Sequence, residues 1–245
     1  MLEQVTAVHS QGRTGTAVSR GSTEAAGMEQ LPDLLLIERA RAGEERAIEA
    51  LSRRYCRRLF RVALSVLGDD ERAAASVQEA YRLAFADLNR HEPNGKFAAW
   101  LTRLSYNQAR QLRASAAARA THPNGSEELR NAAAPTDGAA AELHERLQLE
   151  RSISALPEVF RTVFVLRVIE GISGIETAAS LGVHETTVRT RLYRAQRRLT
   201  PEIVRQARSA QGLFDLAAAR AERIVNAVLS ERPQRSILTI VASTP

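Results

Sequence analysis

Apolar residues recur at every third or fourth position over most of residues 33–206, and this is the period of an amphipathic helix. The pattern is clearest in the stretch 48–66. Its apolar face is formed by Ile48, Leu51, Tyr55, Leu59, Val62 and Val66. Helical periodicity on this scale predicts an all-α protein.

The first part of this region divides into helical stretches that turn-forming residues separate. These stretches are 33–43, 48–66, 71–89 and 97–113. Asp33 is suited to cap the first of them, and glycine, aspartate, asparagine and proline gather in the gaps. Four helices with short connections make a compact bundle, so a first domain is predicted over residues 33–113.

The periodicity stops at residues 114–141, where prolines and Asn-Gly and Asp-Gly pairs lie among alanines. This composition predicts a flexible linker that lets two halves of the chain sit far apart. A second small helical domain is predicted at 142–206. Residues 1–32 are rich in Ser, Thr, Gly and Gln and are predicted to be disordered. Residues 207–245 form a C-terminal extension with a short amphipathic helix.

Residues 172–199 have the pattern of two helices joined by a tight turn at Leu181-Gly182-Val183. Gly182 can adopt the positive φ that reverses the chain there. The apolar stripe of the second helix is Val188, Leu192, Ala195 and Leu199. A helix-turn-helix places its second helix in the major groove, with the N-terminal residues at base edges. The sequence therefore predicts a DNA-binding protein.

Charge supports this prediction by its position more than by its total. The formal net charge is +6, and Lys96 is the only lysine. Arginine pairs bidentately with phosphate and guanine, although a GC-rich genome would favour arginine codons as well. The arginines concentrate at 53–61 and 189–198.

Several other classes of protein find no support in the sequence. A single cysteine, Cys56, excludes a disulfide framework, and the five histidines show no metal-ligand spacing. No apolar run approaches the ~20 residues that span a bilayer, and no secretory signal is visible. No catalytic triad, carboxylate pair or phosphate loop stands out. We expect a cytoplasmic protein that is not an enzyme and uses no cofactor or metal.

Several short motifs resemble the extracytoplasmic-function (group IV) sigma factors of bacterial RNA polymerase. The motifs are IERARAG at 37–43, VQE at 77–79 with Tyr81 and Phe85, Phe97 with Trp100-Leu101 and Asn107, ALP at 155–157, FVLR at 164–167, and Glu170-Gly171. Each motif is weak alone, but their order and spacing together are specific. The resemblance covers residues 34–199 except the linker.

The resemblance implies a sigma factor that binds core RNA polymerase and promoter DNA and directs transcription initiation. The first domain would dock on polymerase, with Gln78 and Glu79 retained for that contact, and would engage the minus-ten element. The second domain would read the minus-thirty-five element. The resemblance also allows an anti-sigma factor as a partner.

Two sets of residues are candidates for contact with the promoter. The minus-thirty-five set is Glu185, Thr186, Thr187, Arg189, Thr190, Arg191, Arg194 and Arg198. The minus-ten set is His91, Asn94, Lys96, Arg103, Asn107 and Arg110. Arginine can pair with guanine and threonine can touch a thymine methyl, whereas the later arginines of the first set are expected at phosphates.

The sequence departs from the family at three places. Residues 73–76 read Ala-Ala-Ala-Ser where the family is usually acidic. Gly174 and Thr177 replace larger side chains, which predicts a loose first reading helix. Two alternatives stay open: a stand-alone helix-turn-helix regulator, for which no dimerising seam is visible, and an adaptor that has lost promoter opening.

Overall fold

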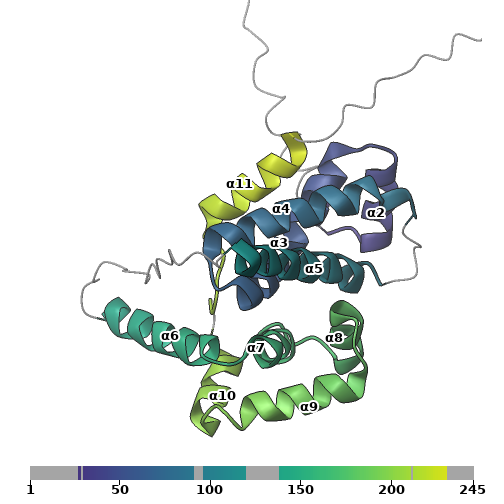
Figure 1. Ribbon diagram of the computed structural model, residues 1–245. Helices are drawn as coiled ribbons and strands as arrows, with labels where there is room; N and C mark the ends of the chain where they lie inside the picture. The colour runs from purple at the N-terminus through teal and green to yellow at the C-terminus, as the bar shows by residue number, and fades with distance from the viewer. Residues whose placement is uncertain (1–26, 29, 91–95, 120–137, 211, 231–245) are drawn as a thin grey trace, which may run out of the picture.

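The computed structural model describes residues 27–28, 30–90, 96–119, 138–210 and 212–230. These residues form helices and turns and contain no strand. The all-α prediction is therefore confirmed. Figure 1 shows one group of helices, α2 to α5 with α11, lying above a second group, α6 to α10.

The first group is a bundle built around α3. Its elements are α2 (Asp33–Arg41), α3 (Glu45–Leu67), α4 (Asp70–Ala86), the 3-10 turn η1 (Leu88–Arg90) and α5 (Phe97–Arg119). Leu59 and Phe60 of α3 are fully buried. The Tyr81 hydroxyl of α4 donates a hydrogen bond of 2.7 Å to the Ser52 carbonyl of α3, so even the polar atom of this buried ring has a partner.

The second group contains the predicted helix-turn-helix. Its elements are α6 (Gly138–Ser154), α7 (Glu158–Phe164), the π-helical segment η2 (Val165–Ile169), α8 (Gly174–Leu181), α9 (Glu185–Gln196) and α10 (Pro201–Ser209). Gly182 follows α8 with φ at 65°, the left-handed conformation that favours glycine. Val188 and Ala195 of the predicted stripe are buried.

The structure corrects two details of the sequence reading. Helix α5 continues to Arg119 and α6 begins at Gly138. Helix thus occupies both ends of the stretch 114–141 that was assigned to a linker, because alanine has the highest helix propensity. Asp33 does not cap α2: Pro32 holds that position without a side-chain cap, and the Asp33 carboxylate instead accepts hydrogen bonds from Arg54 and Tyr55.

The two groups of helices pack against each other, whereas the sequence predicted that they could sit far apart. The Ser65 hydroxyl of α3 lies 2.9 Å from the Thr162 hydroxyl of α7 in a buried hydrogen bond. The Arg61 guanidinium lies 2.6 Å from the Glu170 carboxylate, and the two side chains are only 10% and 12% exposed. We call this contact region the junction. It is formed by α3 and α5 of the first group and by α7, η2 and α8 of the second.

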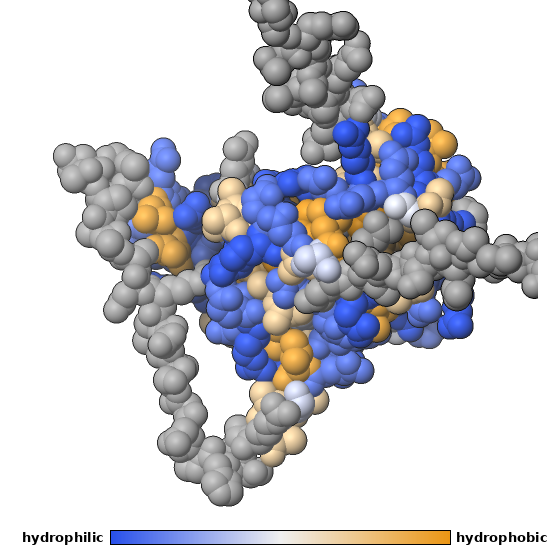
Figure 2. Space-filling view, turned by 90° about the horizontal axis from the view of Figure 1, so that it is seen from above, coloured by the Kyte–Doolittle hydropathy of each residue, from blue (hydrophilic) through white to orange (hydrophobic). Residues whose placement is uncertain are grey.

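One helix crosses from the second group to the first. Helix α11 (Ala218–Ser230) follows α10 in sequence but lies on α3 and α4 of the first group, as Figure 1 shows. Figure 2 shows that this end of the molecule is mostly hydrophilic, with smaller hydrophobic patches between the charged residues. Helix α11 therefore packs on the domain farther from it in sequence.

Candidate nucleic-acid interface

Helix α9 is anchored by its apolar residues and presents its polar residues to solvent. Val188 and Ala195 are 1% and 0% exposed. The exposed members of the minus-thirty-five set are Glu185, Thr186, Arg189, Thr190, Arg194 and Arg198, and the half-buried members are Thr187 and Arg191. The structure therefore places seven of the eight members on α9 and Arg198 in the turn that follows it, with most of the members accessible.

Interactions with neighbouring protein groups orient several of these side chains. The Thr190 hydroxyl donates 2.9 Å to the Thr186 carbonyl, which directs the Thr190 methyl group away from that bond. Arg189 lies 3.9 Å from Glu185 in an exposed pair, a contact weak enough to be exchanged for DNA. The Arg198 guanidinium lies 4.7 Å from the centre of the Phe160 ring, a cation–π distance that holds Arg198 against α7.

The sequence reading missed one exposed aromatic on the same helix. Tyr193 is 58% exposed, and its hydroxyl accepts a hydrogen bond of 3.0 Å from Arg197. An exposed ring beside arginines suits contact with a nucleotide. Its signal in the sequence was its position between Arg191 and Arg194, outside the apolar stripe.

Helix α8 is regular despite Gly174 and Thr177. The Ser173 hydroxyl caps its N-terminus by accepting a hydrogen bond of 3.1 Å from the Glu176 amide. A Cβ on Gly174 would lie 3.0 Å from the Glu185 carboxylate, so the absent side chain leaves room for the start of α9. Thr177 is fully buried. Small residues here allow α8 and α9 to approach closely.

The minus-ten set lies mainly along α5. Arg103, Asn107 and Arg110 are exposed at spacings of four and three residues, so they share a face of the helix. Lys96 is exposed immediately before α5. His91 and Asn94 lie outside the described residues. The structure thus brings three of the six candidates together and places Lys96 at the start of their helix.

This α5 face adjoins the helix-turn-helix at the junction. A Cβ on Gly182 would lie 3.1 Å from the Arg103 guanidinium, so Arg103 lies directly against the turn between α8 and α9. Burial raises the pKa of Tyr106 on α5, the nearby Glu158 carboxylate raises it further, and Arg110 and Arg191 oppose these effects. Arg110 lies 5.7 Å from the centre of the Tyr106 ring, and the charge of Arg191, from the other candidate set, acts on the same hydroxyl.

The candidate polymerase contacts lie on α4. Gln78 and Glu79 are both half-buried. Arg82 donates two hydrogen bonds to the Glu79 carboxylate, at 2.7 and 2.6 Å, and these bonds lower the pKa of Glu79. Glu79 is therefore held ionised, with its charge partly compensated by its own helix.

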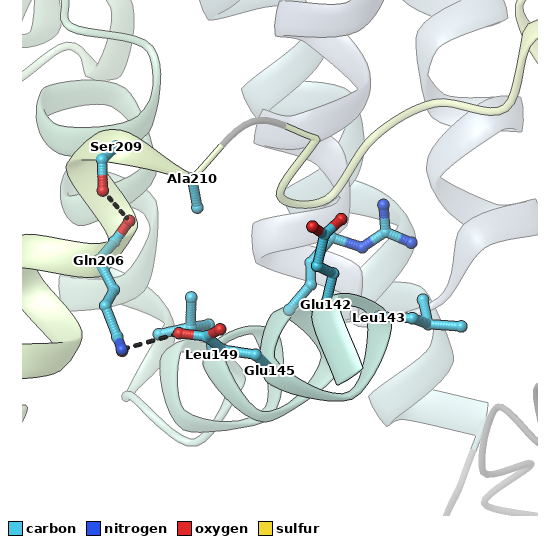
Figure 3. A pocket seen from close by; sticks show the side chains of 8 residues that line it. Glu142, Leu143, Glu145, Leu149, Gln206, Ser209 and Ala210 are labelled. Carbon is cyan, nitrogen blue, oxygen red and sulfur yellow. Dashed lines mark hydrogen bonds between the residues drawn. The ribbon is translucent and has the colours of Figure 1, made fainter. Parts of the chain in front are cut away.

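A cavity with both polar and apolar lining lies away from these surfaces, between α6 and α10. Its volume is about 570 Å³, and Glu142, Glu145, Arg146 and Gln206 contribute its polar lining. Figure 3 shows Gln206 bonded to Glu145 across it, at 2.9 Å. Within the described parts of the chain there is no group of three or more metal-ligating side chains, and no described helix is long and apolar enough to cross a membrane.

Comparison with known proteins agrees with this geometry. The family model "Sigma-70, region 4" matches residues 146–199, which include α7, α8 and α9. The RNA polymerase sigma-H factor of Pseudomonas aeruginosa is 30% identical over 179 residues, which cover 68% of this chain and 91% of the relative. The ECF RNA polymerase sigma-E factor of Escherichia coli is 30% identical over 182 residues, covering 69% and 92%.

A solved structure is similar over the same part of the chain. The structure of CnrH in complex with the cytosolic domain of CnrY is 26% identical, has a TM-score of 0.51, and is matched over 68% of this chain and 93% of that one. The similarity therefore extends over both groups of helices rather than over the helix-turn-helix alone. The chain belongs to the extracytoplasmic-function sigma factors of the sigma-70 family, which direct RNA polymerase to promoters.

Proposed function

We propose that α9 reads the minus-thirty-five element of the promoter. The observation that carries this assignment is the exposed row of Thr186, Arg189 and Thr190 above the buried Val188. These side chains lie in the N-terminal half of the helix, the part that reaches base edges in a helix-turn-helix. Arg194 and Arg198 follow toward the C-terminus, where contacts with phosphates fix position and not sequence.

The α5 face engages the minus-ten element in this proposal. Arg103 and Arg110 supply positive charge for the backbone of a separated strand, and Asn107 supplies an amide that can pair with a base edge. Lys96 begins this row, and His91 and Asn94 precede it in sequence. The assignment requires that the face be released from the helix-turn-helix, because Arg103 lies against Gly182.

Core RNA polymerase binds the first domain through α4, with Gln78 and Glu79 as contacts. An anti-sigma factor is a further proposed partner, in view of the similarity to CnrH bound to the cytosolic domain of CnrY. The protein acts without a cofactor or catalytic activity of its own. Its partners place it in the cytoplasm, where polymerase and promoter DNA occur together.

Transcription in vitro tests these assignments. Genomic fragments are transcribed with core polymerase and the purified chain, and the 5′ ends of the transcripts are mapped. Promoter-specific transcripts are expected from the wild-type chain, and Arg189→Ala should reduce them selectively at promoters that depend on the upstream element. Asn107→Ala should instead slow strand opening, measured by permanganate reactivity of thymines. If each variant lost promoter-selective transcription and strand opening to the same extent, the assignment of α9 and α5 to different promoter elements would be contradicted.

A further inference from the structure

Helix α11 has one apolar face, and that face is buried on the first domain. Ile224, Val225 and Val228 are 0%, 1% and 7% exposed, whereas Glu222 and Asn226 face solvent. Helix α11 contacts both α3 and α4. Its apolar face therefore fills a surface made by two helices of the first domain.

Charged contacts fix the direction of α11 on that surface. Arg220 lies 2.6 Å from the Asp70 carboxylate and 3.0 Å from that of Glu71 at the start of α4. Glu222 lies 2.5 Å from Arg53 on α3. Acidic residues of α4 thus pair with an arginine of α11, and a basic residue of α3 pairs with a glutamate two positions later.

The segment between α10 and α11 ties this helix to the second domain over a short length. Leu213 and Leu216 are buried, and the Phe214 amide donates 2.7 Å to Glu150 of α6. The eight residues between Ser209 and Ala218 can span about 30 Å when fully extended. While α11 is bound, this short segment therefore limits how far the domains can separate.

The other connection between the domains is much longer. Eighteen residues lie between Arg119 and Gly138, and a chain of that length can reach about 60 Å. The minus-ten and minus-thirty-five elements are about 25 base pairs apart, which is roughly 85 Å of B-DNA. Domains joined only by the longer connection can approach that spacing more readily than domains also held through α11.

We propose that α11 is an internal latch, a helix that occupies a helix-binding surface on α3 and α4, holds the two domains closed, and is displaced when core polymerase engages the first domain. A helix of 13 residues is marginally stable by itself in water, so the docked and released states can exchange. The involvement of polymerase rests on the proposed function; the closing of the domains does not.

The single cysteine of the chain provides a reporter for the latch. Cys56 is 3% exposed on α3, and its pKa is raised to about 12 by burial, with Glu222 of α11 raising it and Arg53 lowering it. Arg53, one helical turn before Cys56 on α3, lies 2.5 Å from Glu222 of α11, so the thiol lies on the side of α3 that faces α11. Release of α11 should expose it to alkylating reagents.

The test compares Ile224→Asp with Asn226→Asp in the full-length chain. Both variants place an aspartate within α11, but only the first places it on the buried face. Ile224→Asp should raise the iodoacetamide alkylation rate of Cys56 at least tenfold and increase the radius of gyration measured by X-ray scattering. Asn226→Asp should change neither. Far-UV circular dichroism checks that the remaining helices persist.

Two outcomes of this comparison would overturn the proposal. Equal alkylation rates in the two variants would show that α11 does not cover Cys56, and would overturn it. Faster alkylation at an unchanged radius would show that α11 covers the first domain without holding the domains closed, which also overturns it. If both readouts respond, Ile224→Asp should bind core polymerase severalfold more tightly than Asn226→Asp. Absence of polymerase binding by every variant, including wild type, would refute the proposed function and leave the closing of the domains supported.

Discussion

The two candidate DNA surfaces differ in how the closed molecule presents them. The outer face of α9 carries Thr186, Arg189 and Thr190 in solvent. The face of α5 carries Arg103 against the turn at Gly182. The first surface can meet a duplex without rearrangement of its helix, whereas the second is bounded by the other domain.

This difference matches the kinds of DNA that the two surfaces are proposed to bind. A duplex is available before polymerase acts, so a preformed face suits it. A separated strand exists only after the duplex has opened, and a face bounded by the junction would be used only once the domains part. The closed arrangement therefore favours an order in which the upstream element is recognised before the strands separate.

The largest effect is expected from a substitution that disrupts the junction. Arg61→Ala removes one partner of the 2.6 Å pair with Glu170, whose side chains are 10% and 12% exposed. Loss of Arg61 leaves Glu170 with the longer 3.8 Å contact to Arg58 in place of the 2.6 Å pair, and we expect a loss of about 3 kcal/mol in the free energy of unfolding. Urea denaturation measures it. Arg205→Ala, on the exposed side of α10, is the control, and its loss in the free energy of unfolding should stay below about 0.5 kcal/mol. An equally small loss for Arg61→Ala would show that the Arg61–Glu170 pair does not stabilise the junction.

The next effect concerns the exposed surface alone. Arg189→Ala should weaken binding to duplexes that carry the upstream element by about 1–3 kcal/mol, roughly 5- to 150-fold, without lowering stability, because Arg189 makes only a 3.9 Å surface contact with Glu185. Fluorescence anisotropy with matched and scrambled duplexes measures the change. An equal loss on both duplexes would assign Arg189 to phosphate contact instead of base recognition.

Gly182→Ala should act on the boundary between the surfaces. Gly182 has φ at 65°, and a left-handed conformation costs an L-residue about 1–2 kcal/mol. The added Cβ would also lie 3.1 Å from Arg103. Thermal denaturation measures the loss. Gly174→Ala is the matched control, with a smaller expected loss because its nearest neighbour is the movable Glu185 carboxylate. If adding Arg103→Ala to Gly182→Ala fully restores the thermal stability, the contact with the Arg103 side chain, and not the backbone conformation, causes the loss.

The smallest effect is expected from Glu79→Gln on α4, outside both candidate DNA surfaces. Hydrogen bonds from Arg82 lower the pKa of Glu79, so this pair adds stability at neutral pH that is lost as pH falls through the folded-state pKa. The Arg82 and Glu79 side chains are 50% and 40% exposed, so solvent screens the pair and its contribution should stay below about 0.5 kcal/mol. Urea midpoints of wild type and Glu79→Gln should differ slightly at pH 7 and converge once pH falls below the folded-state pKa of Glu79. A difference between the two urea midpoints that grows as pH falls would contradict the expectation that the pair stabilises the fold at neutral pH.

The sequence was sufficient for features that repeat along one helix. The apolar spacing of α3 and of α9 predicted their buried faces, and the turn at Gly182 has the conformation that glycine suggested there. Features that depend on two distant segments left no periodic signal. The Ser65–Thr162 hydrogen bond joins residues 97 positions apart, and the Arg220–Asp70 pair joins residues 150 apart.

The candidate site shows the same division. The exposure of the candidate residues on α9 followed from local pattern, because its apolar stripe and its arginines alternate around one helix. The contact of Arg103 with the helix-turn-helix did not, because Arg103 and Gly182 meet only after both domains have folded and packed. Tyr193 was overlooked because a single exposed aromatic does not alter the apolar period of α9.

Ionic strength should affect promoter engagement in two opposing ways, because arginines form both the ion pairs that hold the domains together and the contacts with phosphate. Arg113 and Glu158 lie 2.6 Å apart at the junction, and Arg53 and Glu222 lie 2.5 Å apart beneath α11. Both pairs are partly exposed and weaken as salt screens them, which favours separation of the domains. Added salt also weakens phosphate contacts steeply. Promoter engagement should therefore pass through a maximum at intermediate ionic strength instead of falling steadily from the lowest salt.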